Sequence, residues 1–118
     1  MLYYYKAKVL AVHDGDTITA NIDLGLLTWV MDQKIRLYGI NAPELRGATK
    51  AAGIASRDFL DSLLNGKEVH IETRKDKKCK FGRWLGTIWV PVEEDSQTML
   101  NVNQRMINAG HAIKFMDE

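Results

Sequence analysis

Polar and apolar residues alternate along the first third of the chain, a pattern typical of strands with one buried face. Residues 17–24 alternate strictly and are rich in β-branched side chains, so they predict a half-buried strand. Residues 5–12 predict the strand before it, and the DGD sequence at 14–16 predicts the turn between the two. A third strand, at residues 34–40, should end at the NAP sequence 41–43, because proline stops regular strand pairing.

The apolar spacing then changes to three- and four-residue steps from Ala52 to Leu63, which predicts a helix. Asn65-Gly66 supplies the stop expected at the end of that helix. Three further elements are predicted: strands at residues 68–73 and 85–90, and a short helix at residues 102–109 that is closed by Gly110.

Five short strands, with a helix between the third and the fourth, fit a small closed or partly closed barrel, and the OB-fold has this order of elements. A sandwich would need more strands, and a doubly wound sheet would need more helices. We therefore expect a mainly β chain of the α+β class. It should form a five-stranded OB-fold β-barrel with one central helix and a short C-terminal helix, as a single domain over residues 1–118.

The composition is that of an ordinary globular chain, with 46% hydrophobic and 26% charged residues. Cys79 is the only cysteine, so we expect no disulfide partner. The longest apolar stretch, residues 24–31, is far shorter than a membrane span, so we expect no membrane partner. Without a signal-like N-terminus the chain is expected to be cytoplasmic, or secreted if a signal segment has been removed. We also expect a monomer.

The net charge of +1 is unevenly distributed along the chain. Residues 74–83 contain six cations and one acid, a local balance of +5, so the remaining residues must sum to −4. Such a run is most simply a solvated loop. The alternative is an edge that binds phosphate groups, which would make binding of nucleic acid sensitive to salt.

Four short segments carry candidate chemistry. The DGDT sequence at 14–17 is by itself most simply a hairpin device. Arg36 interrupts an apolar strand, where it indicates either a structural salt bridge or an anion site. The NAPE sequence at 41–44 places a carboxylate just past a strand, and the KFGR sequence at 80–83 places an arginine after a glycine that permits close approach of a ligand.

In combination, DGDT, R-x(4)-NAPE and KFGR on a five-stranded barrel strongly resemble the staphylococcal nuclease (thermonuclease) family. The pattern of that family is a DGDT-like turn, an arginine followed by D-x-P-E, and a later Y/F-G-R. The VN and AGHA sequences between residues 102 and 112 also resemble the last helix of that family. The resemblance runs from Val9 to Ala112, nearly the whole chain.

This resemblance implies a calcium-dependent nuclease with little sequence preference, which hydrolyses DNA and RNA and leaves 3′-phosphate ends. The nucleic acid would be single-stranded or a locally opened duplex. By resemblance, Asp16 would be a carboxylate ligand of Ca²⁺, and Ala42 would offer its carbonyl. Asn41 stands where the family usually has a second liganding aspartate, and Asp14 and Thr17 would support the ligands.

The resemblance also implies how the substrate would be held and cut. Arg36 and Arg83 would grip the scissile phosphate, since guanidinium groups bind phosphate oxygens bidentately and stay charged. Glu44 would be the general base or the group that orients the attacking water. Lys80 and Phe81 would contact the substrate; Phe81, where tyrosine is common, cannot donate a hydrogen bond.

The departure from the family pattern at Asn41 leaves a second hypothesis open. The chain could be a binding module on the same barrel, for nucleic acid or protein, with a weakened metal site. Relatives of that kind tend to lose the arginines and the glutamate, whereas Arg36, Glu44 and Arg83 are all present here. The sequence therefore favours an enzyme.

Overall fold

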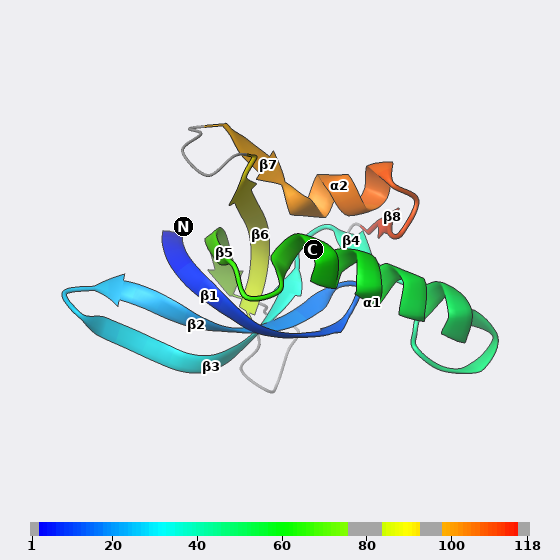
Figure 1. The fold of residues 1–118 in the computed structure, drawn as a ribbon, viewed down its shortest axis with the longest axis horizontal. Coiled ribbons are helices and arrows are strands. Elements are labelled where there is room, and N and C mark those ends of the chain that lie inside the picture. The colour runs from blue at the N-terminus through cyan, green and yellow to red at the C-terminus, as the bar shows by residue number, and fades with distance from the viewer. Residues whose placement is uncertain (1–2, 76–83, 93–97, 116–118) are drawn as a thin grey trace.

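A computed structural model of the chain describes residues 3–75, 84–92 and 98–115 (Figure 1). Strands dominate the first half of the chain, and the helices follow them. The elements are β1 (Tyr3–Asp14), β2 (Thr17–Gly25), β3 (Thr28–Leu37), β4 (Ile40–Asn41), the 3-10 turn η1 (Gly47–Thr49), α1 (Lys50–Leu64), β5 (Glu68–Lys75), β6 (Trp84–Pro91), β7 (Met99–Asn101), α2 (Val102–Asn108) and β8 (Ile113–Lys114).

Five of these strands form a closed barrel, which confirms the expected fold class. The sheet order is β3-β2-β1-β5-β6-β7, and β3 also pairs with β6, so the barrel closes on itself. The closing pair is parallel and places Arg36 opposite Leu85 and Leu37 opposite Gly86. A side chain at Gly86 would press on Ile35 and Ile71 from 3.0 Å, so this glycine lets the two strands meet.

The core has the period of 2 predicted for β2, but α1 buries Gly53, Ser56, Leu60 and Leu64, one position on from the apolar series of residues 52–63 that predicted the helix. In β2 every second residue is buried, as expected for a strand with one face against the core. The helix α1 contributes Leu60 and Leu64, and α2 contributes Val102 and Met106, all completely buried. No helix among the described residues is long and apolar enough to cross a membrane.

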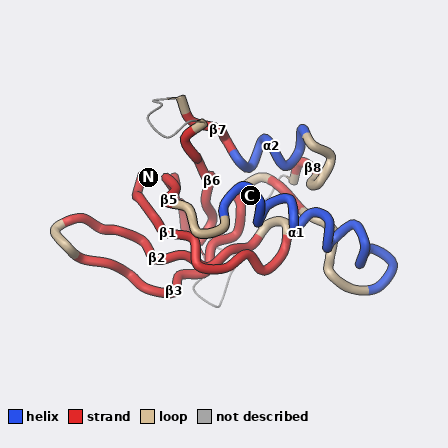
Figure 2. The backbone as a smooth tube through the Cα atoms, viewed as in Figure 1, coloured by secondary structure: helices blue, strands red, loops and turns tan. Residues whose placement is uncertain are grey.

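The structure differs most from the prediction around β3. This strand begins at Thr28, six residues before the predicted start, and Ile40–Asn41 forms the separate strand β4, which pairs with β8. The outer parts of β2 and β3, residues 23–31, project from the barrel as a two-stranded arm, because the last β1–β2 pair is Lys6 with Asp23 (Figure 2). The sequence conceals this hairpin because the two residues at its tip are leucines, preceded by a single glycine, Gly25, inside an apolar run.

Candidate active site

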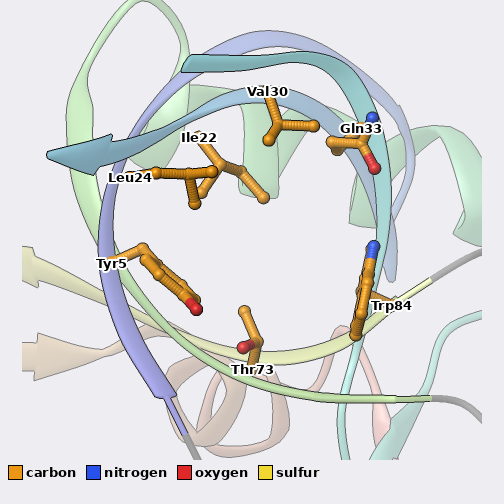
Figure 3. Close-up of a pocket in the computed structure, with 7 residues that line it drawn as sticks. All are labelled: Tyr5, Ile22, Leu24, Val30, Gln33, Thr73 and Trp84. Carbon is orange, nitrogen blue, oxygen red and sulfur yellow. The ribbon is translucent and has the colours of Figure 1, made fainter. Parts of the chain in front are cut away.

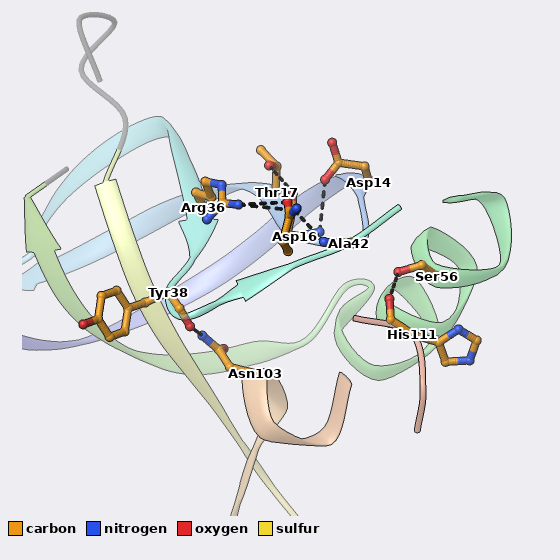
Figure 4. Close-up of polar contacts among 10 residues, drawn as sticks. Asp14, Asp16, Thr17, Arg36, Tyr38, Ala42, Ser56, Asn103 and His111 are labelled. Atoms are coloured by element: carbon orange, nitrogen blue, oxygen red, sulfur yellow. Dashed lines mark hydrogen bonds and ion pairs between the residues drawn. The ribbon is translucent and has the colours of Figure 1, made fainter. Parts of the chain in front are cut away.

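Asp16 is the centre of the candidate site, at the turn between β1 and β2 (Figure 4). The side chain of Asp16 is 11% exposed. Its Oδ2 accepts a hydrogen bond from the backbone N–H of Ala42 at 3.0 Å, and its Oδ1 accepts one from the Thr17 hydroxyl at 3.1 Å. The backbone N–H of Asp16 donates to Asp14 Oδ1 at 3.0 Å. The structure thus brings together the DGDT turn and the segment after β4.

Gly15 allows this turn to sit directly on α1. A Cβ at this position would overlap the Ser56 hydroxyl and lie 2.7 Å from the Cβ of Ala42. The same hydroxyl donates a hydrogen bond to the carbonyl of His111 at 2.7 Å. The absence of a side chain at Gly15 therefore lets the turn, α1 and the segment after α2 meet at the site.

Arg36 lies beside Asp16 with its guanidinium largely buried. The Arg36 Nη2 is 3.7 Å from Asp16 Oδ2 and 3.3 Å from Asn41 Oδ1, and the side chain is 13% exposed. The Arg36 Nη1 is buried and has no hydrogen-bond partner among the described residues. A buried charged donor without an acceptor is costly, so this nitrogen points to an anionic ligand. The ring of Phe115 lies 5.4 Å from the guanidinium carbon.

The surroundings raise the pKa of Asp16 to about 6 from the ordinary 3.8. Burial is the main cause, and the neighbouring Asp14 adds to it. The Ala42 N–H and the Arg36 guanidinium lower the pKa of Asp16, but by less than burial and Asp14 raise it. Burial therefore disfavours the ionised form of Asp16 by more than the Ala42 N–H and Arg36 favour it, and a bound cation would favour the ionised form.

The residues present fit a hard cation by the kind of donor that they offer. Asp14 and Asp16 are carboxylates, and Asn41 adds an amide oxygen; calcium prefers oxygen ligands of these kinds. The described part of the chain holds no group of three or more His, Cys, Asp or Glu side chains that could bind a metal. The N–H of Ala42 donates a hydrogen bond to Asp16. Binding of calcium by the carbonyl of Ala42 stays a prediction.

Glu44 lies in the loop after β4 and is exposed. The backbone of this loop is fixed, because the carbonyl of Glu44 accepts a hydrogen bond from the Thr49 hydroxyl at 3.0 Å. Gly53 of α1 packs against the same carbonyl, which a Cβ there would overlap. The loop that carries the proposed base is therefore anchored to the helix by its main chain, with the carboxylate left to face solvent.

Three of the predicted site residues, Lys80, Phe81 and Arg83, lie outside the described residues. The described strand β6 begins directly after them at Trp84, which pairs with Ile35, the neighbour of Arg36. Their predicted contacts with phosphate and substrate stay predictions.

Sequence reasoning missed the role of Asn103, which lies behind the site on α2. Its Nδ2 donates to the carbonyl of Tyr38 at 2.9 Å (Figure 4). The same nitrogen donates to the carbonyl of Gly86 at 3.0 Å, and the side-chain oxygen accepts from the N–H of Ile88 at 3.0 Å. This buried amide joins α2 to both strands of the parallel closure. The stacking partner Phe115 was also missed, because no local pattern brings it to Arg36.

Comparison with known proteins gives one family. Residues 34–118 match the family described as staphylococcal nuclease homologue. The chain is 31% identical over 109 residues to a protein named ParB from Escherichia coli, covering 91% of this chain and 55% of that protein. It is 30% identical over 89 residues to the thermonuclease of Staphylococcus hyicus, covering 73% of this chain and 49% of the enzyme.

A protein of Methanocaldococcus jannaschii without an assigned function is 28% identical over 130 residues, covering 92% of this chain and 58% of that protein. The chain therefore spans about half the length of these curated relatives. The family match includes Arg36, Asn41, Ala42 and Glu44, whereas the DGDT turn precedes it.

Proposed function

Because the chain belongs to the staphylococcal nuclease homologue family, we propose that it is a calcium-dependent nuclease that cuts DNA and RNA with little sequence preference. The substrate would be single-stranded or a locally opened duplex, and the products would carry 3′-phosphate ends. The similarity to two staphylococcal thermonucleases, at 30% and 31% identity, supports this reading.

The observation that carries the proposal is the state of Arg36. Its Nη2 faces Asp16 and Asn41, while its Nη1 is buried with no partner in the described part of the chain. A phosphate oxygen placed at Nη1 would satisfy the last buried donor and add a charge-assisted hydrogen bond. The ring of Phe115 also lies beside the guanidinium, and because Nη1 is covered in this structure, the covering atoms would have to move for a phosphate to reach it.

The chemistry assigns a separate task to each residue. Arg36, and Arg83 by the family pattern, would hold the phosphoryl oxygens on which negative charge builds. Glu44 would take a proton from the attacking water as the new P–O bond forms, while the P–O5′ bond breaks and the leaving oxygen is protonated by solvent. An exposed carboxylate on an anchored loop suits a group that must reach a water molecule.

Asp16, Asn41 and the carbonyl of Ala42 would hold the calcium ion, with Asp14 and Thr17 supporting these ligands. When bound there, the ion would polarise a phosphoryl oxygen and balance the charge of the substrate. The raised pKa of Asp16 supports a cation at this place, because two neighbouring carboxylates are poorly compensated without one.

The second candidate is a binding module of the same family that has lost its catalysis. Only Asn41 favours it, since an amide in place of a carboxylate removes one negative charge beside the metal. The buried Arg36 donor is compatible with both candidates, because a module that binds phosphate without cutting it would use the same contact.

The deciding experiment is cleavage of single-stranded DNA in the presence of Ca²⁺ or EDTA. The variants are Arg36→Ala, Glu44→Gln and Arg83→Ala. Arg57→Ala and Glu68→Gln serve as controls, since the Arg57 side chain is 39% exposed, Glu68 is exposed, and neither is a predicted site residue. Enzymatic cleavage should need calcium and fall about 10²-fold or more in each site variant, with the controls unchanged. Tight DNA binding without cleavage at any calcium concentration would establish the binding module instead.

A further inference from the structure

The turn of the arm is built from two leucines that the fold itself does not use. Leu26 and Leu27 are 99% and 97% exposed, so neither packs on the core. Both have a positive φ, 54° and 62°, a conformation that two-residue hairpin turns reach most easily with Asn and Gly. Leucine in this region is strained. Two strained, fully exposed leucines at one tip indicate a role outside the monomer.

The barrel carries an apolar cavity beside the base of the arm, which we call the mouth (Figure 3). The mouth lies toward the end of the barrel away from the link between α1 and β5. The carbonyl of Lys67, in that link, accepts a hydrogen bond from the N–H of Val9, and Val9 is four residues along β1 from Tyr5, which lines the mouth. The cavity measures about 230 Å³ and is partly open. The side chains that line it are Tyr5, Ile22, Leu24, Val30, Gln33, Thr73 and Trp84.

The mouth has the size and the chemistry to receive a leucine side chain. An apolar cavity of roughly 150 Å³ already takes up a benzene-sized molecule. The lining is mostly aliphatic and aromatic, as a leucine requires. One molecule therefore presents both an exposed apolar tip and a cavity that suits it.

We propose that two copies of this chain associate by inserting the Leu26–Leu27 tip of each arm into the mouth of the other. The two residues Leu24 and Val30 belong to both the arm and the lining of the mouth. The tip lies two residues beyond Leu24, about 7 Å along the strand. Two arms laid antiparallel, inner face to inner face, thus bring each tip to the mouth of the other copy. A two-fold exchange of this kind is closed, so it yields a dimer and not a filament.

The arm itself carries no cation, although the mouth-lining residues Thr73 and Trp84 flank the basic run at residues 74–83 in the sequence. Asp23 and Asp32 lie on the arm or at its base, and residues 23–31 contain no lysine or arginine. A wedge that enters nucleic acid is normally flanked by cations that neutralise phosphate. The same absence of cations disfavours binding to anionic lipids.

The area involved predicts a weak dimer. A fully exposed leucine removes on the order of 100 Å² of apolar surface from water when it is buried. The four tip leucines of two copies, the half-exposed Leu24 residues and the mouths that they cover then bury roughly 700 Å² in total, which is in the range of weak, transient interfaces. We expect a reversible dimer with a dissociation constant on the order of micromolar. This departs from the monomer expected on the sequence.

The test is sedimentation velocity of the full chain from about 1 to 500 μM, with and without replacement of the tip. The double variant Leu26→Asn/Leu27→Gly installs the preferred residues for this turn, so it should fold at least as stably and remain monomeric at all concentrations. The control is Met31→Thr, which removes a 57% exposed apolar side chain of the same arm that does not line the mouth, and it should dimerise as the wild type does.

A second variant, Leu24→Lys, places a charge in the mouth while the tip stays intact. It should lose self-association as the tip variant does. A wild-type chain that is monomeric throughout, or a tip variant that still dimerises, would overturn the proposal. So would a monomer whose leucines bind phosphatidylcholine vesicles, since the tip would then serve a lipid surface.

Discussion

The Asp16 carboxylate accepts a hydrogen bond from the backbone N–H of Ala42 at 3.0 Å, across 26 residues of chain. This contact joins the DGDT turn to the segment that carries Asn41 and Glu44. It therefore sets the spacing between the expected metal ligands and the expected base. The same carboxylate faces Arg36 at 3.7 Å, so one side chain links the metal side of the site to the phosphate side.

Replacing Asp16 with asparagine should stabilise the metal-free fold at neutral pH. The folded pKa of about 6 lies above the ordinary 3.8, so the folded state binds more protons between these values, and the wild type loses stability as pH rises through this window. Asparagine keeps an oxygen for the Ala42 N–H, and the Thr17 hydroxyl can turn to accept from the new amide. We expect a gain of roughly 1–3 kcal/mol at pH 7 in EDTA.

Thermal unfolding of wild type and Asp16→Asn in EDTA at pH 4, 5, 6 and 7 measures this effect. The advantage of the variant should shrink steadily toward pH 4, where the wild-type carboxyl is protonated when folded. Added calcium should narrow the difference at pH 7 by binding the wild type alone. An advantage that does not change with pH would assign the gain to packing and not to charge.

Changing Asn41 to aspartate should strengthen calcium binding. The change adds one negative charge beside Asp16 and Asp14, and calcium affinity rises with the number of charged ligands. We expect a gain on the order of tenfold, measured by calorimetric titration. Asn65→Asp, an exposed change just after α1, is the charge-matched control. An unchanged calcium affinity in Asn41→Asp would remove Asn41 from the proposed ligand set.

Removing the Asn103 side chain should destabilise the protein severely. Asn103→Ala leaves the buried N–H of Ile88 without its acceptor and removes the Asn103 donor from the carbonyl of Tyr38, whereas the carbonyl of Gly86 keeps its bond from the N–H of Tyr38. We expect a loss of about 2–5 kcal/mol in the free energy of unfolding, measured by urea titration. Gln104→Ala, on an exposed position of the same helix, should cost about 0.5 kcal/mol or less. Equal losses in the two variants would contradict the bridging role.

A methyl group at Gly15 should disturb the site through packing. In Gly15→Ala the new Cβ overlaps the Ser56 hydroxyl and crowds Ala42, so the turn must move away from α1. We expect a loss of about 1–3 kcal/mol in stability. Removal of the hydroxyl in Gly15→Ala/Ser56→Ala should restore part of it, because the tightest overlap is then gone. The coupling is read from a double-mutant cycle in urea, and strictly additive losses would show that the two residues do not meet.

Local patterns in the sequence were enough to predict most of the elements. Strict alternation placed β2 to within one residue, and the apolar spacing placed α1, because burial of one face imposes a period of 2 on a strand and 3.6 on a helix. The short motifs also identified the kinds of residue at the site. The residue types are informative even before the fold is known, because two carboxylates and an arginine occur together in few kinds of protein site.

Only the tertiary structure decided how distant segments meet. The parallel pairing of β3 with β6, the contact of Arg36 with Phe115 and the three hydrogen bonds of Asn103 all join parts of the chain that no local pattern relates. Each depends on strand register and on closure of the barrel. A period in the sequence shows which face of an element is buried, but it does not show what the face is buried against.

The apolar run at residues 24–31 shows the same limit. Its composition suits a buried strand, yet it forms an arm whose turn has two leucines in a strained, exposed conformation. Hydrophobicity measures how favourable burial would be, and the register of β1 with β2 decides whether anything within the chain covers the residues. Beyond the pair of Lys6 with Asp23, β1 no longer accompanies the arm, so its leucines reach solvent.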